Sequence, residues 1–284
     1  MSTAAGGQAV ELAGRVALVT GGARGQGRSH AAALAAAGAT VVVADIAGPV
    51  ASVGYPLASA AELDDTVAGI RAGGGRAEAA VCDVRDGPAV GALVDGIVAA
   101  HGRLDVLVAN AGICGFGAVD TLTDEEWADT IATNLSGVFH CVRAAVPPMR
   151  EAGFGRIVAI SSGAGRAGMA TLAHYSASKW GVIGLVKSVA LETARDGITA
   201  NVVCPTTVRT PMVCNDSTYR TFRPDLAEPG PDDVVPALAR MSPMGVPWLE
   251  PQDVTRTVLH LVTDPGVISG AVLDVNLATS AGRT

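Results

Sequence analysis

A glycine-rich turn near the start of the chain restricts the possible fold more than any other feature. An apolar strand is predicted before it at 15–20, and an alanine-rich helix after it at 28–37. A second predicted strand, 40–44, ends in Asp45. Glycines in such a turn let a pyrophosphate approach the helix N-terminus, while the acidic residue binds ribose hydroxyls. The pattern predicts a dinucleotide site formed by Gly21, Arg24, Gly25, Gln26, Gly27 and Asp45.

Strands and helices continue to alternate along the chain. Further strands are predicted at 77–82, 104–109, 157–160, 198–204 and 270–275, and further helices at 62–73, 88–101, from 123 onward, 177–191 and 251–263. This alternation is typical of parallel sheets. We therefore predict an α/β fold, a doubly wound parallel sheet of the Rossmann type, as a single domain over residues 12–284. Residues 1–11 are small and polar without periodicity, and we expect a disordered lead-in there.

Composition excludes several classes of function. The net charge is −7 and no Lys/Arg cluster occurs, which argues against nucleic acid or anionic membranes as partners. No apolar run approaches the length of about 18–20 residues that a membrane span needs, and no signal peptide is recognisable. The five cysteines show no C-x-x-C pairing, and neither they nor the histidines form a metal-binding cluster. We expect a cytoplasmic protein with reduced thiols, no metal and a small-molecule substrate.

Three polar side chains are predicted to meet beyond the strand 157–160. The strand delivers Ser162 to its carboxyl end, where open α/β sheets bind ligands. Tyr175 and Lys179 are four positions apart, so they share one face of a helix. A lysine cation beside a phenol is expected to lower the phenol pKa from about 10. The Tyr-x-x-x-Lys spacing alone is common on amphipathic helices, but with Ser162 and the glycine turn it predicts that Tyr175 exchanges a proton with an alcohol that Ser162 orients.

The Tyr-Ser-Ala-Ser-Lys run at 175–179, with the serine and the glycine turn, resembles the short-chain dehydrogenases/reductases of the single-domain type over residues 12–275. The resemblance implies that Asn134 is a fourth catalytic residue, holding a water that links Lys179 to solvent. The ordinary alternative is a polar residue that distorts its helix and bonds to backbone. The cofactor contacts that the family pattern implies, besides the glycine turn and Asp45, are Asp83, Val84, Asn110, Ala111, Gly112, Tyr175, Lys179, Pro205, Val208 and Thr210.

Asp45 and Arg24 point to different cofactors. A carboxylate at position 45 would bind an unmodified ribose and repel a 2′-phosphate, which favours NAD. A basic residue such as Arg24 before the second glycine occurs in relatives that use the phosphorylated cofactor. We expect NAD, because the carboxylate lies directly at the ribose and the arginine can swing into solvent. Two departures from the family pattern, Thr206 in place of glycine and Asn276-Leu277-Ala278 near the end, leave the backbone there unassigned.

Residues 46–61 form an insertion where a short connection is usual, and its apolar side chains favour covering the adenosine end of the cofactor. The runs at 22–30, 55–58, 205–212 and 218–226 resemble the carveol-dehydrogenase-like, mycofactocin-associated branch, whose insertion buries NAD so that it does not readily exchange. Residues 212–250 form a proline-rich segment that we predict to be a loop acting as a lid over an apolar substrate, or a contact with another subunit.

We therefore predict an NAD-dependent oxidoreductase that interconverts a secondary alcohol and a ketone, with a cyclic, terpenoid-like alcohol as the substrate implied by the branch. The family resemblance also implies a homotetramer, and the branch implies mycofactocin as the redox partner. One alternative is an NADPH-linked ketoreductase acting on 3-oxoacyl thioesters or other ketones. Another is a non-catalytic NAD-binding sensor or assembly protein, which would have no need of a phenol activated as a base.

Overall fold

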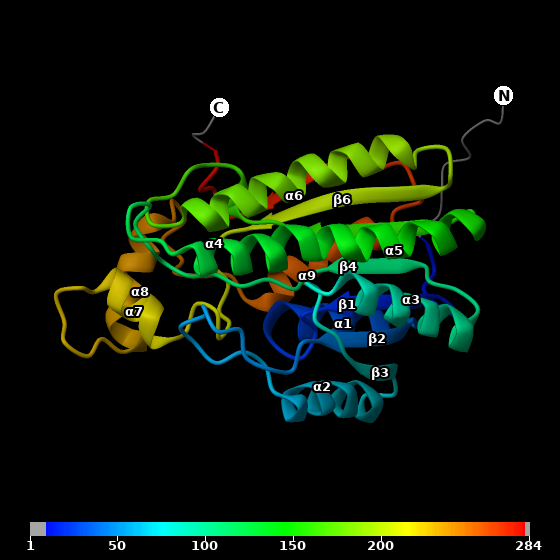
Figure 1. Ribbon diagram of the computed structural model, residues 1–284, viewed down its shortest axis with the longest axis horizontal. Helices are drawn as coiled ribbons and strands as arrows, with labels where there is room; N and C mark the ends of the chain where they lie inside the picture. The colour runs from blue at the N-terminus through cyan, green and yellow to red at the C-terminus, as the bar shows by residue number, and fades with distance from the viewer. Residues whose placement is uncertain (1–9, 282–284) are drawn as a thin grey trace.

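Seven parallel strands form one sheet in the computed structural model, which describes residues 10–281 (Figure 1). Their order across the sheet is β3-β2-β1-β4-β5-β6-β7. The strands are β1 (Val16–Thr20), β2 (Thr40–Asp45), β3 (Arg76–Val81), β4 (Val106–Ala109), β5 (Gly155–Ile160), β6 (Ile198–Pro205) and β7 (Val272–Val275). The predicted doubly wound parallel sheet is confirmed. Residues 1–9 of the predicted lead-in lie outside the described residues, whereas Val10 donates its N–H to the Thr263 carbonyl.

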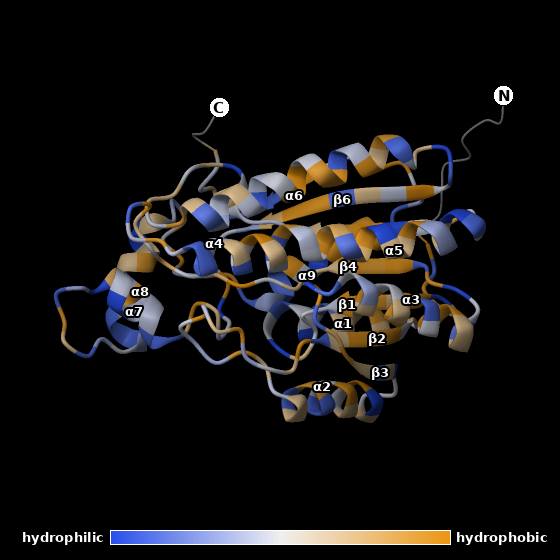
Figure 2. Cartoon of the chain, in the orientation of Figure 1, coloured by the Kyte–Doolittle hydropathy of each residue, from blue (hydrophilic) through white to orange (hydrophobic). Residues whose placement is uncertain are grey.

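Helices cover both faces of the sheet, and each face has its own apolar core. One core lies under α3 (Gly87–His101), α5 (Gly137–Glu151) and α6 (Ala173–Glu192). The other lies under α1 (Gly25–Ala36), α2 (Ala60–Ala72) and α9 (Pro251–Thr263). Because both faces are covered, the inner strands are mostly apolar, which Figure 2 shows as orange ribbons at β2 and β4.

The strand order places the binding crevice at the middle of the sheet. The chain winds outward from β1 in one direction to β2 and β3 and then returns to β4 on the other side of β1. Loops leaving the carboxyl ends of β1 and β4 therefore diverge, and ligands of such sheets bind in the gap between them. Helix α1 begins at Gly25, three residues before the predicted Arg28, so the glycine turn itself supplies the helix N-terminus at this gap.

The helix predicted from residue 123 onward is interrupted. Thr123 caps α4 (Asp124–Ile131) and accepts the Glu126 N–H as part of a capping box. A π-helix, η1 (Ala132–Ser136), follows and leads into α5. Asn134 lies in this π-helix, a type of distortion that is frequent at functional sites.

The segment 212–250, predicted as a lid loop, is helical over part of its length. It contains α7 (Asp216–Phe222) and α8 (Pro231–Met241), which Figure 1 shows as a lobe at the left end of the molecule. The Asn215 side chain caps α7, and Pro231 opens α8 at a position where its missing N–H costs nothing. Val234 and Leu238 pack against Tyr219 in a small separate core, so the prediction of a loop was wrong over α7 and α8.

Candidate active site

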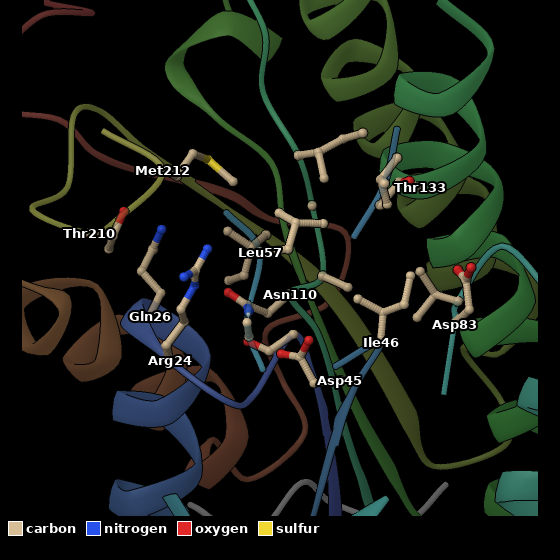
Figure 3. A pocket seen from close by; sticks show the side chains of 18 of the residues that line it. Arg24, Gln26, Asp45, Ile46, Leu57, Asp83, Asn110, Thr133, Thr210 and Met212 are labelled. Carbon is tan, nitrogen blue, oxygen red and sulfur yellow. Dashed lines mark hydrogen bonds between the residues drawn. The ribbon is translucent and has the colours of Figure 1, made fainter. Parts of the chain in front are cut away.

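One cavity spans the carboxyl ends of the central strands and gathers most of the predicted site residues (Figure 3). Figure 3 shows Asp83 on one side of the cavity and Thr210 with Met212 on the other. The predicted residues that line it are Gly21, Arg24, Gln26, Asp45, Asp83, Val84, Asn110, Ala111, Gly112, Tyr175, Lys179 and Thr210.

The glycine turn packs directly against the loop after β4. The Asn110 amide donates hydrogen bonds to the Thr20 and Gly21 carbonyls, at 3.0 and 3.1 Å. A Cβ on Gly21, whose φ is +62°, would lie 2.8 Å from the Ala111 Cα, and one on Gly27 would lie 2.1 Å from the Gly21 carbonyl oxygen. Only glycine fits either position. Helix α1 therefore begins at the edge of the cavity, which Gln26 of its first turn lines, and a helix N-terminus there suits a pyrophosphate.

Asp45 and Arg24 are both fixed by hydrogen bonds. Asp45 is 8% exposed and accepts the Ala23 N–H at 3.0 Å through Oδ2. Arg24 does not swing into solvent as expected, because it donates to the Pro56 carbonyl and lies 3.8 Å from the Glu62 carboxylate. The arginine charge is thus partly neutralised, and a carboxylate stands at the expected ribose position. These residues fit a dinucleotide with an unmodified ribose.

Ser162, Tyr175 and Lys179 come together at the other end of the cavity, beyond β5. The Ser162 hydroxyl accepts the Ala164 N–H at 3.1 Å and lies close enough to the Tyr175 phenol to act toward lowering its pKa. Lys179 is 4% exposed, and its Nζ donates to the Ile160 carbonyl at 2.9 Å while lying 5.6 Å from the centre of the Tyr175 ring. The predicted cluster of a serine, a phenol and an ammonium group is therefore present in the structure.

The pKa of Tyr175 departs from the sequence prediction. Burial raises the pKa of the Tyr175 phenol above its ordinary value of 10.0, and the hydrogen bond from Ser162 only partly opposes this effect. Burial also lowers the pKa of Lys179 to about 8. The expected lowering of the phenol pKa is thus not found in the protein alone, because both groups are enclosed and burial penalises their charged forms.

Asn134 is fully buried and its side chain already has backbone partners. Its Oδ1 accepts the Ile113 N–H at 2.8 Å, and its Nδ2 donates to the Ile113 carbonyl at 2.9 Å and to Ser178 Oγ at 3.2 Å. Both amide hydrogens are therefore donated to groups of the protein itself. This agrees with the alternative interpretation of Asn134, as a polar residue that distorts its helix and bonds to backbone. A Cβ on Gly112 would lie 3.3 Å from Asn134 Oδ1 and 3.4 Å from Lys179 Nζ, so the glycine keeps the space between them open.

Six predicted residues do not line the cavity. Ser162 affects the pKa of the Tyr175 phenol, which does line the cavity. Val208 is 3% exposed and belongs to the core under α1, α2 and α9. Thr206, which replaces the family glycine, donates its N–H to the Val275 carbonyl and so extends the pairing of β6 with β7. The six residues are Gly25, Gly27, Asn134, Ser162, Pro205 and Val208.

Several residues that line the cavity were not among the predicted site residues. Arg85 and Thr133 line it, as do Met212 and several residues of the insertion. Arg85 directly follows the predicted pair Asp83–Val84 in the sequence. Its position next to that pair was the feature from which it could have been predicted to line the cavity. The insertion residues are Ile46, Val50, Tyr55, Leu57 and Ala58, which extend from the Asp45 end to the catalytic end rather than covering the adenosine end alone.

Comparisons with known proteins agree with this geometry. The family model of the short chain dehydrogenases matches residues 15–220. A (-)-trans-carveol dehydrogenase of Rhodococcus erythropolis is 44% identical over 94% of this chain and 98% of its own length. A crystal structure of a carveol dehydrogenase from Mycobacterium avium in complex with NAD is 41% identical, with a TM-score of 0.93, covering 95% of this chain and 99% of that one.

The chain is a short-chain dehydrogenase. The family that the sequence motifs predicted, with its carveol-dehydrogenase-like branch, is thereby confirmed. A putative ketoacyl reductase of Streptomyces coelicolor is 38% identical over 78% of this short-chain dehydrogenase and 84% of its own length, so the alternative class also lies within the family. Within residues 10–281, none of its helices is both long and apolar enough to cross a membrane.

Proposed function

We propose that this short-chain dehydrogenase is an NAD-dependent oxidoreductase that interconverts a secondary alcohol and a ketone. The observation that carries the proposal is the cavity itself. Asp45 and the glycine turn lie at one end, and Tyr175 with Lys179 lies at the other. A dinucleotide held at the first end would bring its reactive ring to the second, where a proton donor and acceptor is available.

Each polar residue has a distinct task in this proposal. Bound NAD supplies the hydride chemistry. Tyr175 passes a proton to or from the substrate oxygen, and Ser162 orients that oxygen through its hydroxyl. Lys179 holds the cofactor ribose, and its positive charge, 5.6 Å from the centre of the Tyr175 ring, acts against the penalty that burial places on the phenolate. Asn134 fixes the Ile113 backbone and borders the open space beside Lys179, where a water could carry protons to solvent.

The proposed substrate is a cyclic, terpenoid-like alcohol. The substrate end of the cavity includes apolar side chains, Ile113, Ile160 and Met212, which suit a hydrocarbon ring. Two relatives named carveol dehydrogenases, both above 40% identity, support the same class.

The insertion supports slow exchange of NAD. Arg24 of the glycine turn bonds the Pro56 carbonyl, and the Cys114 N–H donates to the Tyr55 hydroxyl at 3.3 Å. The insertion is thus tied to both sides of the cavity. If NAD stays bound, its electrons need an external acceptor, and the resemblance to the mycofactocin-associated branch makes mycofactocin the acceptor that we propose.

Two alternatives fit the structure less well. An NADPH-linked ketoreductase would have to place a 2′-phosphate beside Asp45, while Arg24 is engaged by Glu62. A non-catalytic NAD sensor would have no use for Ser162 and Tyr175 hydrogen-bonded at the end of the cavity.

The proposed assembly is a homotetramer that forms through the helices containing Asn134 and Tyr175. Trp127, Phe139, Trp180 and Leu191 on α4, α5 and α6 are 41–82% exposed, which is unusual for large apolar side chains. The proposed location is the cytoplasm, which suits five free thiols.

The test is to denature freshly purified protein and identify the released nucleotide by mass spectrometry. We expect NAD in near-stoichiometric amount, and oxidation of cyclic secondary alcohols only with an artificial electron acceptor. Protein that emerges empty would contradict slow exchange, and free NAD and NADP would then be compared as cosubstrates. A clear preference for NADP would contradict the role of Asp45.

A further inference from the structure

Tyr55 is a second buried phenol in the cavity of Tyr175. It belongs to the insertion, is 8% exposed, and lines the same cavity as Tyr175 and Lys179. The mechanism proposed above leaves the Tyr55 hydroxyl without a chemical task.

The Tyr55 hydroxyl uses only half of its hydrogen-bonding capacity. It accepts the Cys114 N–H at 3.3 Å. A phenol can also donate one hydrogen, and within residues 10–281 no acceptor receives it. A buried donor without a partner is costly, and such groups in native proteins usually have an explanation such as a ligand or water.

Tyr55 is held in place on both sides of its position in the chain. The next residue, Pro56, has a fixed φ and accepts the hydrogen bond from Arg24. Val50 and Ala58, before and after it, are each 6% exposed. A donor held in this way is preorganised, so a bound acceptor loses little entropy in meeting it.

The surroundings of Tyr55 indicate which molecule supplies the acceptor. Arg24 of the glycine turn donates a hydrogen bond to the carbonyl of the adjacent Pro56, and the Tyr55 hydroxyl accepts the N–H of Cys114, two residues after the Asn110–Gly112 turn. Tyr55 therefore lies between the phosphate end and the catalytic end of the cavity. We propose that Tyr55 is a positioning residue whose hydroxyl donates a hydrogen bond to a ribose or phosphate oxygen of the bound dinucleotide. This inference rests on the proposed function, since it requires a dinucleotide in the cavity.

The test compares Tyr55→Phe with the matched control Tyr219→Phe. Tyr219 is also 8% exposed, but it bonds Cys214 in the small core of α7 and α8 and does not line the cavity. NAD dissociation is measured from stripped and reloaded protein, together with KM for the alcohol. We expect Tyr55→Phe to release NAD about 10- to 100-fold faster, as for loss of a hydrogen bond to a charged group, and Tyr219→Phe to match the wild type.

A second measurement separates positioning from a structural role, because Tyr55→Phe also removes the acceptor of the Cys114 N–H. A purely structural loss would lower Tm equally with and without NAD, whereas our proposal requires a smaller rise in Tm on adding NAD. Unchanged NAD release, or a higher KM for the alcohol with unchanged NAD release, would overturn the inference. Wild-type protein that binds no dinucleotide would overturn the proposed function and this inference with it.

Discussion

Lys179 is a buried cation whose only hydrogen bond within the described residues goes to a carbonyl oxygen, that of Ile160. Burial lowers its pKa from 10.5 to about 8, so at pH 7 the folded protein carries the unfavourable charged form. We predict that Lys179→Met abolishes turnover but makes the nucleotide-free protein more stable at pH 7. Urea unfolding of both proteins measures this, and a less stable variant would contradict it.

The same burial predicts how stability depends on pH. Between about pH 8 and 10.5 the unfolded chain holds a proton that folded Lys179 has released, so the free energy of unfolding rises with pH across this window. The shift corresponds to on the order of 3 kcal/mol. The difference between wild type and Lys179→Met should therefore shrink as pH rises from about 8 to about 10. A difference that stays constant would argue that the lysine is not desolvated.

Asp45 sets the predicted choice of cofactor. Replacing it with Asn keeps an acceptor for the Ala23 N–H but removes the charge that would repel a 2′-phosphate. We predict that Asp45→Asn shifts the ratio of NADP to NAD affinity by about tenfold or more toward NADP. Asp64→Asn on the exposed side of α2 is the control for charge alone. An unchanged ratio would mean that another group discriminates.

At the residue scale, spacing was enough to find the cluster of Ser162, Tyr175 and Lys179, because helix and strand geometry place such residues together. It did not predict the raised pKa of Tyr175, since burial depends on packing from distant parts of the chain. Residue spacing also did not predict the hydrogen bond from Arg24 to the Pro56 carbonyl of the insertion, because the two residues are 32 positions apart.

At the scale of elements, the insertion is fastened to helix α4. Ser52 Oγ donates to Asp129 at 2.7 Å, and Asp129 also accepts Arg85 at 2.9 Å. We predict that Ser52→Ala loosens the insertion and speeds NAD release by about 3- to 10-fold, in line with the loss of one hydrogen bond. Ser188→Ala removes a bond within α6 only and should leave the rate unchanged. Equal rates in all three proteins would mean that this fastening does not limit release.

The elements that sequence could predict are those with a clear period or cap. The strands followed from apolar runs, and α4 begins at Asp124, next to the predicted helix start at 123. The π-helix was not predictable, because it is stabilised by bonds from Asn134 to Ile113, 21 positions away. Helices α7 and α8 were not predicted because the segment is rich in proline, although Pro231 in fact opens α8.

At the scale of the whole molecule, the layered α/β architecture followed from alternating strands and helices, but assembly depends on surface chemistry. Trp180 on α6 is 53% exposed beside the other large apolar side chains of that layer. We predict a particle of four times 28.4 kDa by light scattering, and smaller particles for Trp180→Glu, because a buried charge would oppose association. Val81→Glu, at a 70% exposed site on β3, should leave the mass unchanged. A monomeric wild type would exclude the tetramer.

The most direct test of the whole account is a single-turnover experiment on NAD-loaded protein. Carveol or another cyclic secondary alcohol is added without an electron acceptor, and the near-ultraviolet absorbance of reduced nicotinamide is followed. We predict reduction of the bound nucleotide by wild-type protein, and a rate about 10²- to 10⁴-fold lower in Tyr175→Phe, which keeps its NAD. Reduction at equal rates in both proteins, or in neither with any alcohol of the class, would contradict the proposed reaction.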